Sequence, residues 1–324
     1  MRAALIETPG SPAVAGERPE PVRGDGEVLV AVSAAPIVPL DRLCASGTSY
    51  FGVPSTPYVP GVQGVGLVLD GTVDLPTGTP VWFATSAGMQ PGDGSMRAVA
   101  AVPVHDVVAL PPGADPVLVA ALGLSAVAAW MALTLRGGLT AGERVLVLGA
   151  GGVVGQAAIQ LARSAGAGRI VAAARGERSG DRALALGADV AVSLGGTASD
   201  DVPDVAELAD RLRVDGPVDL VVDPLFGVPA AAALRVLRPH GRLVNLGGSA
   251  AETSPIDSST LRSRSLRLLG YTNNDLTPEQ RAGALTHVVD EVLAGRLTAA
   301  HEPVPLVDVT GVWNHAGDRI VLIP

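Results

Sequence analysis

A short apolar segment that leads directly into a cluster of glycines constrains the fold of this chain most strongly. The segment ERVLVLGA contains Gly149, and Gly151, Gly152 and Gly155 follow within six residues. A helical pattern, QAAIQLARSAGA, comes next, and a second apolar segment, RIVAAA, follows it. Strand, tight turn, helix and strand in this order form a βαβ unit, which predicts two parallel neighbours in one sheet.

The glycine turn of this unit is suited to binding a dinucleotide. Backbone N–H groups can approach a pyrophosphate where no side chain intervenes, and the dipole of the next helix favours negative charge. The first motif position is alanine, and a glycine turn can be purely structural, but the complete βαβ unit favours binding. We therefore predict a set of cofactor-binding residues in this loop: Ala150, Gly151, Gly152, Val153, Val154 and Gly155.

The remaining pattern divides the chain into two domains. The first 120 or so residues contain short β segments broken by glycine and proline, which predicts a mostly antiparallel, barrel-like domain. From about residue 123 helices and strands alternate, which predicts a doubly wound parallel sheet. We expect the barrel-like catalytic domain at 1–121, the nucleotide domain at 122–271 and a return to the first domain at 272–324, with the active site between the domains.

Composition excludes several classes of partner. The net charge is −9, and the 23 basic residues are scattered arginines without a single lysine, which argues against nucleic acid or an anionic membrane as the main partner. The single cysteine, Cys44, excludes an intramolecular disulfide. The N-terminus lacks a signal-peptide pattern, and no window offers about 18 unbroken apolar residues, so we expect a cytoplasmic protein.

Several motifs together resemble the medium-chain dehydrogenase/reductase superfamily, and within it the zinc-independent quinone oxidoreductase branch. They are VAVSAAPIVPLDRLCASGTSY, YVPGVQGVG, ALGLSAVAAWMAL, VLVLGAGGVVG, VDLVVDPLFG and GRLVNLGG, and they cover essentially the whole chain. The resemblance implies a GroES-like catalytic domain and a Rossmann domain. It also implies that the loops containing Pro224, Leu225, Phe226, Leu246 and Gly247 contact the nicotinamide part of the cofactor.

The resemblance implies a site without metal. The positions of the catalytic zinc ligands in the superfamily's alcohol dehydrogenases fall on Val38, Val62 and Leu124, and the neighbouring acid falls on Gln63. Zinc needs nitrogen, sulfur or carboxylate oxygen donors, which valine and leucine do not supply. We therefore expect no metal ion, and the five dispersed histidines do not change this expectation.

Without a metal, hydrogen-bond donors must stabilise the charge that develops during reaction. Tyr50 matches a tyrosine of the family's substrate cleft and is a candidate catalytic donor, although it could equally line the pocket. Ser125 is a second catalytic candidate, although a helix serine more often bonds to its own backbone.

Other side chains shape the expected site without acting in it. Phe226, Trp82 and Phe83 suggest a restricted apolar site, with Trp82 better explained as a core residue. Asp41 and Asp223 are interpreted as supports of a turn and of a strand end, and not as acids for catalysis.

The end of the segment RIVAAA predicts which cofactor binds. NAD-binding domains carry an acidic residue there for the ribose hydroxyls, whereas this chain has Ala174. Arg175 and Arg178 follow, and their guanidinium groups can bind a 2′-phosphate, so we predict NADPH. The alternatives are that both arginines are solvated, and that Glu177 serves the ribose.

We therefore expect a reductase that uses NADPH to transfer hydride to a small molecule, either a quinone or an α,β-unsaturated carbonyl compound. Two alternatives stay open: a non-catalytic NADPH-binding sensor, and a biosynthetic enzyme that uses the same cleft for a cyclisation. The segment SLRLLGY resembles the edge strand through which relatives pair, so we also expect a homodimer.

Overall fold

The computed structural model describes residues 1–195, 204–214 and 216–324. The chain divides into two compact units. Unit 1 comprises Met1–Gly123, Thr277–Ala294 and Ala299–Pro324, and unit 2 comprises Leu124–Leu276 and Gly295–Thr298.

Unit 2 is built on a six-stranded sheet in which every pair of neighbours is parallel. Its strands are β8 (Arg144–Leu148), β9 (Arg169–Ala174), β10 (Val190–Ser193), β11 (Val218–Asp223), β12 (Leu237–Asn245) and β13 (Arg267–Gly270). They lie in the order β10-β9-β8-β11-β12-β13, so the strand order reverses between β8 and β11. In doubly wound sheets ligands bind at this reversal, beyond the carboxyl ends of the strands.

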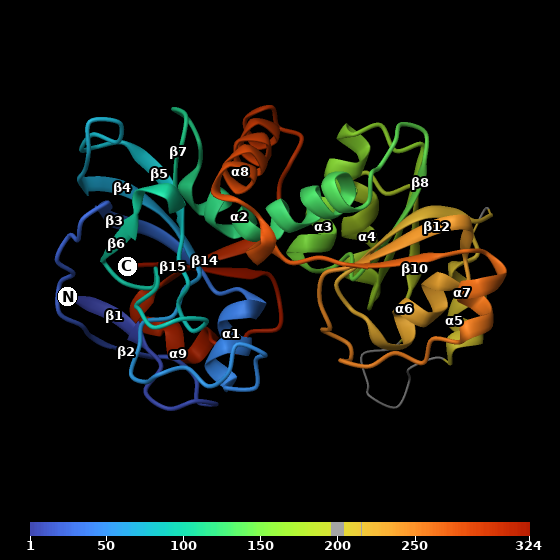
Figure 1. Ribbon diagram of the computed structural model, residues 1–324, viewed down its shortest axis with the longest axis horizontal. Coiled ribbons are helices and arrows are strands. Elements are labelled where there is room, and N and C mark those ends of the chain that lie inside the picture. The colour runs from blue at the N-terminus through green and yellow to red at the C-terminus, as the bar shows by residue number, and fades with distance from the viewer. Residues whose placement is uncertain (196–203, 215) are drawn as a thin grey trace. The chain divides into compact units, whose positions relative to one another are not determined.

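Helices cover both faces of this sheet. Helices α3 and α4 lie on one side, and α5 and α6 lie on the other (Figure 1). The helices of unit 2 are α3 (Val153–Ser164), α4 (Glu177–Ala185), α5 (Val205–Leu212), α6 (Gly227–Leu234) and α7 (Ser258–Ser263), with the short η3 (Asn273–Asp275). Leucine, valine and alanine side chains from the strands, α5 and α6 form one core, which includes Leu146, Val171, Leu208, Val221 and Leu234.

Unit 1 is mostly antiparallel. Its main sheet follows the path β14-β15-β3-β4-β5-β7, with β6 also paired to β3, and β1 pairs separately with β2. The strands are β1 (Arg2–Leu5), β2 (Val14–Glu17), β3 (Glu27–Pro36), β4 (Gln63–Asp70), β5 (Pro80–Ala84), β6 (Val99–Pro103), β7 (Val107–Ala109), β14 (His301–Pro305) and β15 (Arg319–Ile323). Strand β15, near the end of the chain, lies beside β3 from the N-terminal region (Figure 1). The parallel sheet of unit 2 and the mostly antiparallel sheet of unit 1 confirm the predicted fold class.

Helices complete unit 1. They are α1 (Pro39–Ser46), α8 (Pro278–Leu293) and α9 (Val309–Val312), with the short η1 (Val104–Asp106) and η4 (Leu306–Asp308). Helix α8 begins where the sequence is best suited to start a helix, because Thr277 and Gln280 form a capping box and Pro278 takes the first helical position.

Helix α2 (Pro116–Met131) starts earlier than the helix that the sequence pattern predicts from residue 123. The Asp115 carboxylate accepts hydrogen bonds from the amides of Val117 and Leu118 and so caps the earlier start. The helix is interrupted at Gly123, where φ is 27° and ψ is −126°. A Cβ at this position would lie 2.0 Å from Oε1 of Gln63, so only glycine fits.

The segment Pro116–Arg136 is long and apolar enough to cross a membrane by length and composition. It comprises α2 and the π-helix η2 (Ala132–Arg136). A segment of this length was not expected, because the sequence predicts no apolar window of membrane-spanning size. However, 67% of the apolar window is buried inside the protein. Such burial is typical of a core helix.

The predicted boundary at 272–324 implies that the tail returns to unit 1 as one piece, and the structure differs from this prediction. Residues Gly295–Thr298 belong to unit 2. The Gln160 side chain on α3 accepts a hydrogen bond from the Thr298 amide at 3.0 Å and donates one to the Thr298 carbonyl at 2.8 Å. This paired contact ties the segment to the helix that follows the glycine loop.

Candidate functional site

The glycine loop lies between β8 and α3, at the carboxyl edge of the parallel sheet. Gly149 has φ 64°, and Gly152 is the residue before the first helical residue, Val153. A Cβ at Gly155 would lie 2.4 Å from the Gly149 carbonyl oxygen, so close packing of helix on strand requires glycine there. At Gly152 the nearest atom lies 3.6 Å away, and this residue is exposed. The loop therefore leaves its backbone open at the helix N-terminus, as a bound anion requires.

The buried Gln156 holds this loop in place. Its side-chain nitrogen donates to the Gly151 carbonyl at 2.9 Å, about one turn before it in the chain. Gln160, one turn further along α3, donates to the Gln156 carbonyl at 2.9 Å. Two polar residues inside an apolar helix are thus used to fix the loop and the 295–298 segment, a role that the sequence analysis did not assign.

The end of β9 brings a second predicted group to the same edge. Ala174 is buried at the strand end, and Arg175 and Arg178 are exposed. Among the described residues, Arg175 makes no hydrogen bond or ion pair, so its guanidinium is available to an added anion. Gly176, with φ 75°, turns the chain into helix α4.

Ser179 is a candidate that the sequence analysis missed. A Cβ at Gly151 would lie 2.8 Å from the Ser179 Oγ, so this hydroxyl in the first turn of α4 directly faces the glycine loop. Its position between the loop and the arginines suits a donor to a phosphate oxygen or a ribose hydroxyl. No local pattern signals it, because the proximity depends on how β8 and β9 lie in the sheet.

The predicted nicotinamide loops follow β11 and β12. A Cβ at Gly149 would lie within 3.0 to 3.3 Å of Leu225 and Pro224, and one at Gly247 would lie 3.0 Å from the Pro224 carbonyl oxygen. The structure therefore brings the glycine loop, Pro224–Phe226 and Leu246–Gly247 together at one edge of the sheet. The switch point of this sheet lies at the same edge.

Phe226 has an unusual backbone conformation in this group. Its φ is 58° and its ψ is −153°, a combination that is essentially restricted to glycine. Such a conformation costs about 1–3 kcal/mol and persists only where its surroundings impose it. The ring itself packs against the apolar core of unit 2.

The two predicted catalytic side chains lie in different units. Tyr50 follows α1 in unit 1, is 79% exposed, and its ring centroid lies 4.3 Å from that of Phe51. Ser125 lies in α2 in unit 2, two residues after the break at Gly123, and is buried. Trp82 and Phe83 are both fully buried in unit 1, so Phe83, like Trp82, is a core residue and does not crowd a cleft.

The positions that match metal ligands in the superfamily carry apolar side chains. Val38 and Val62 are buried, and the Asp41 carboxylate joins their backbones by accepting from the Val38 amide at 2.8 Å and the Val62 amide at 2.9 Å. At the third position, the Leu124 carbonyl accepts a hydrogen bond from the Asn273 side chain at 3.0 Å. Within residues 1–195, 204–214 and 216–324, no three histidine, cysteine, aspartate or glutamate side chains are placed to hold a metal ion.

Burial determines the electrostatics around Asp41. It raises the pKa of this carboxyl to about 6, while the two amide hydrogen bonds and the positive charge of Arg319 act in the opposite direction. Arg319 on β15 donates to the Ile37 carbonyl at 2.7 Å, and its own burial lowers its pKa to about 10. The sequence predicts a turn support at Asp41, and its hydrogen bonds are those of such a support.

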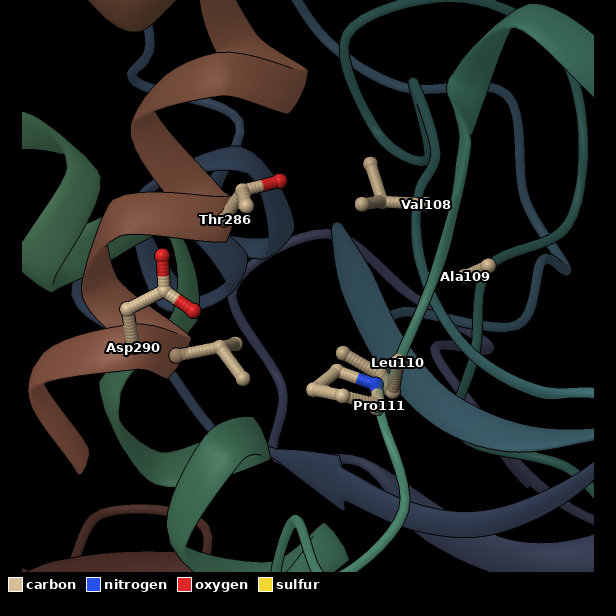
Figure 2. Close-up of a pocket in the computed structure, with 7 residues that line it drawn as sticks. Val108, Ala109, Leu110, Pro111, Thr286 and Asp290 are labelled. Carbon is tan, nitrogen blue, oxygen red and sulfur yellow. The ribbon is translucent and has the colours of Figure 1, made fainter. Parts of the chain in front are cut away.

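A separate pocket of about 340 Å³ lies in unit 1 between β7 and α8. Figure 2 shows Thr286 and Asp290 on the helix facing the apolar segment Val108–Pro111. None of the residues that line it is a predicted site residue. One exposed carboxylate over an apolar wall does not define a ligand, so we assign it no function.

Comparison with known proteins gives the family. A family model described as zinc-binding dehydrogenase matches residues 153–290. The chain is 30% identical over 291 residues to prostaglandin reductase-3 of Bos taurus, covering 86% of this chain and 72% of that protein. It is also 30% identical over 290 residues to the Streptomyces orinoci spectinabilin polyketide synthase system protein NorB. This alignment covers 87% of this chain but only 12% of that protein.

A solved structure shows the same likeness over the full length. The quinone oxidoreductase of Thermus thermophilus, which has also been determined in complex with NADPH, is 29% identical, with a TM-score of 0.80 and 100% coverage of both chains. The chain belongs to the medium-chain dehydrogenase/reductase superfamily, in its quinone oxidoreductase-like branch. It is therefore an oxidoreductase by family membership.

Proposed function

We propose that this protein is a zinc-independent reductase that uses NADPH to transfer hydride to a quinone or an α,β-unsaturated carbonyl compound. The observation that carries the cofactor assignment is the end of β9, where Ala174 leaves room for a 2′-phosphate and the exposed Arg175 has no partner among the described residues. The NADPH complex of the Thermus thermophilus relative supports the same assignment.

The residues present fit this cofactor. The backbone of the glycine loop, which is open at Gly152, would receive the pyrophosphate. Arg175 and Arg178 would bind the 2′-phosphate, and the loops after β11 and β12 would contact the nicotinamide half. When bound, NADPH supplies the hydride. A carboxylate at position 174 would repel the phosphate, and its absence removes that penalty.

The substrate class follows from the side chains available. Valine and leucine at the positions that match metal ligands cannot polarise a carbonyl group, so a neutral donor must serve. In conjugate reduction the negative charge spreads onto a distant oxygen, and one donor such as the Tyr50 phenol can stabilise it. For the same reason we favour a quinone or an enone over a simple ketone.

The test combines turnover with cofactor preference. NADPH oxidation should be measured with 1,4-benzoquinone, 9,10-phenanthrenequinone and simple enones, and compared with NADH. We expect Arg175→Ala to raise the Michaelis constant for NADPH by roughly 10-fold to 150-fold, because a charged hydrogen bond contributes about 1.5 to 3 kcal/mol, and to leave that for NADH nearly unchanged.

Ala174→Asp provides the matched reciprocal change and should move preference toward NADH. Equal use of both cofactors by the wild type at physiological salt would contradict the role of Arg175. Tight NADPH binding without turnover across the whole panel would instead indicate a non-catalytic NADPH-binding protein.

A further inference from the structure

The loop that contains the strained backbone of Phe226 is hydrogen-bonded to a buried carboxylate. Oδ1 of Asp223 accepts hydrogen bonds from the amides of Leu225 and Phe226, both at 2.9 Å. The intervening Pro224 has no N–H, so this oxygen receives the first two amides that the loop offers. Asp223 is fully buried, and the loop therefore cannot exchange these bonds for water without exposing the carboxylate.

Asn245 holds the other oxygen of this carboxylate. Asp223 and Asn245 are register partners at the ends of β11 and β12. The Asn245 side-chain nitrogen lies 3.0 Å from Oδ2 of Asp223, 3.2 Å from the Asp223 carbonyl and 2.8 Å from the Gly247 carbonyl. One amide group thus joins the loop after β11 to the loop after β12.

These contacts order one particular half of the proposed cofactor site. With the pyrophosphate on the loop after β8, the β9 side of the sheet takes the adenosine half, and the β11 and β12 side takes the other mononucleotide. Glycine at position 226 would adopt the observed φ and ψ without strain. Phenylalanine there needs an external restraint, and the hydrogen bonds of Asp223 and Asn245 contribute to it.

We propose that Asp223 and Asn245 are positioning residues that hold the loop of Phe226 in its strained conformation so that the nicotinamide half of the cofactor binds to a pre-ordered surface. This inference rests on the proposed NADPH-binding function. It predicts that the two halves of the ligand respond differently when the restraint is removed, because only one half contacts the restrained loops.

The experiment compares a whole ligand with a half ligand. Dissociation constants for NADPH, from its fluorescence, and for 2′,5′-ADP, from calorimetry, should be measured for wild type and Asn245→Leu. We expect about a 10-fold to 100-fold weaker NADPH affinity, with that for 2′,5′-ADP unchanged within about 2-fold, as expected for loss of pre-organisation on one side only.

A matched control lies at the opposite end of the same sheet. Asp189 accepts a hydrogen bond from the Ile170 amide and pairs with Arg163, so Asp189→Ala removes comparable structural bonds far from these loops. It should lower the melting temperature without separating the two ligands. If Asn245→Leu does not fold, Asn245→Ser keeps a shorter donor and serves for the same comparison.

A second variant separates positioning from general support. Phe226→Gly removes the need for restraint, so in that background Asn245→Leu should weaken NADPH binding much less than it does in the wild type. Equal weakening of both ligands by Asn245→Leu, or no weakening of either, would overturn the inference. A wild type that binds neither NADPH nor 2′,5′-ADP would instead overturn the proposed function.

Discussion

Trp82 donates a hydrogen bond from its indole nitrogen to Oε1 of Gln63 at 3.1 Å, and both side chains are fully buried. Gln63 also donates to the Ala120 carbonyl at 3.4 Å. Of the positions matching the zinc site, Gln63 is the one with a polar side chain, and that amide is engaged in the core.

We therefore expect no stoichiometric zinc in the purified protein and no loss of activity on treatment with a chelator. Neither the valines nor the engaged amide supplies a donor that zinc accepts. Metal analysis by mass spectrometry checks this, and about one tightly held zinc ion per chain, as a closed or catalytic zinc site would contain, would contradict it.

Gln63→Leu should lower the free energy of unfolding by about 1–3 kcal/mol, because it leaves the buried Trp82 N–H without an acceptor. The metal content should stay unchanged. Urea unfolding measures the loss, and Trp82→Phe in the same background should recover part of it by removing the orphaned donor. An additive double variant would show that the two side chains are not coupled.

The raised pKa of the buried Asp41 carboxyl should make the free energy of unfolding depend on pH. Its pKa is raised to about 6 in the folded protein against 3.8 for an exposed aspartate, so the folded state binds the proton more tightly than the unfolded state. The stabilisation from protonation is complete below pH 3.8 and is lost as the pH rises through about 6. The total effect is on the order of 3 kcal/mol.

The measurement is urea unfolding of the wild type and Asp41→Asn between pH values of about 4.5 and 7.5, which span the titration of a carboxyl with a raised pKa. The wild type should lose stability relative to the variant as the pH rises, because asparagine does not ionise. A difference that is constant with pH, or that changes in the opposite direction, would mean that Arg319 and the two amides outweigh the desolvation of Asp41.

The glycine loop, the alternation of strands and helices in unit 2 and the family could be predicted from sequence because each depends on local pattern, whereas β10 and α5 were not among the predicted elements. The turn between β8 and α3 needs small residues at fixed spacing, and the apolar runs on either side determine the parallel strands. The long-range partners of the residues that fix the site could not be predicted in the same way. Asp41 meets Val62 across 21 positions, and Gln160 meets Thr298 across 138.

Strand register explains most of what was missed. Asn245 reaches Asp223 because both end neighbouring strands at the same level, and a shift of one residue would turn either side chain to the other face. Ser179 faces Gly151 for a similar reason. Register is a property of the assembled sheet, and no single segment of the sequence carries it.

Tyr50→Phe should lower turnover on enones by up to about 100-fold, equivalent to roughly 3 kcal/mol for one donor to developing negative charge. NADPH affinity should remain unchanged. Phe51→Leu is the matched control, since Phe51 contacts the Tyr50 ring but has no hydroxyl. Steady-state kinetics measure the turnover number, and cofactor titration measures the NADPH affinity. An unchanged turnover number for Tyr50→Phe would mean that Tyr50 only lines the pocket.

The edge position of β13 leads to a prediction about assembly. This strand ends the parallel sheet beside β12, and Leu268 on it is 41% exposed. An apolar edge strand tends to pair with a second chain, and charge on such an edge prevents pairing. We expect the wild type to sediment as a homodimer at micromolar concentration and Leu268→Arg to sediment as a monomer.

Leu184→Arg, at a similarly exposed leucine on α4, should leave the dimer intact. A wild type that is monomeric at that concentration would show that this edge is left unpaired in solution.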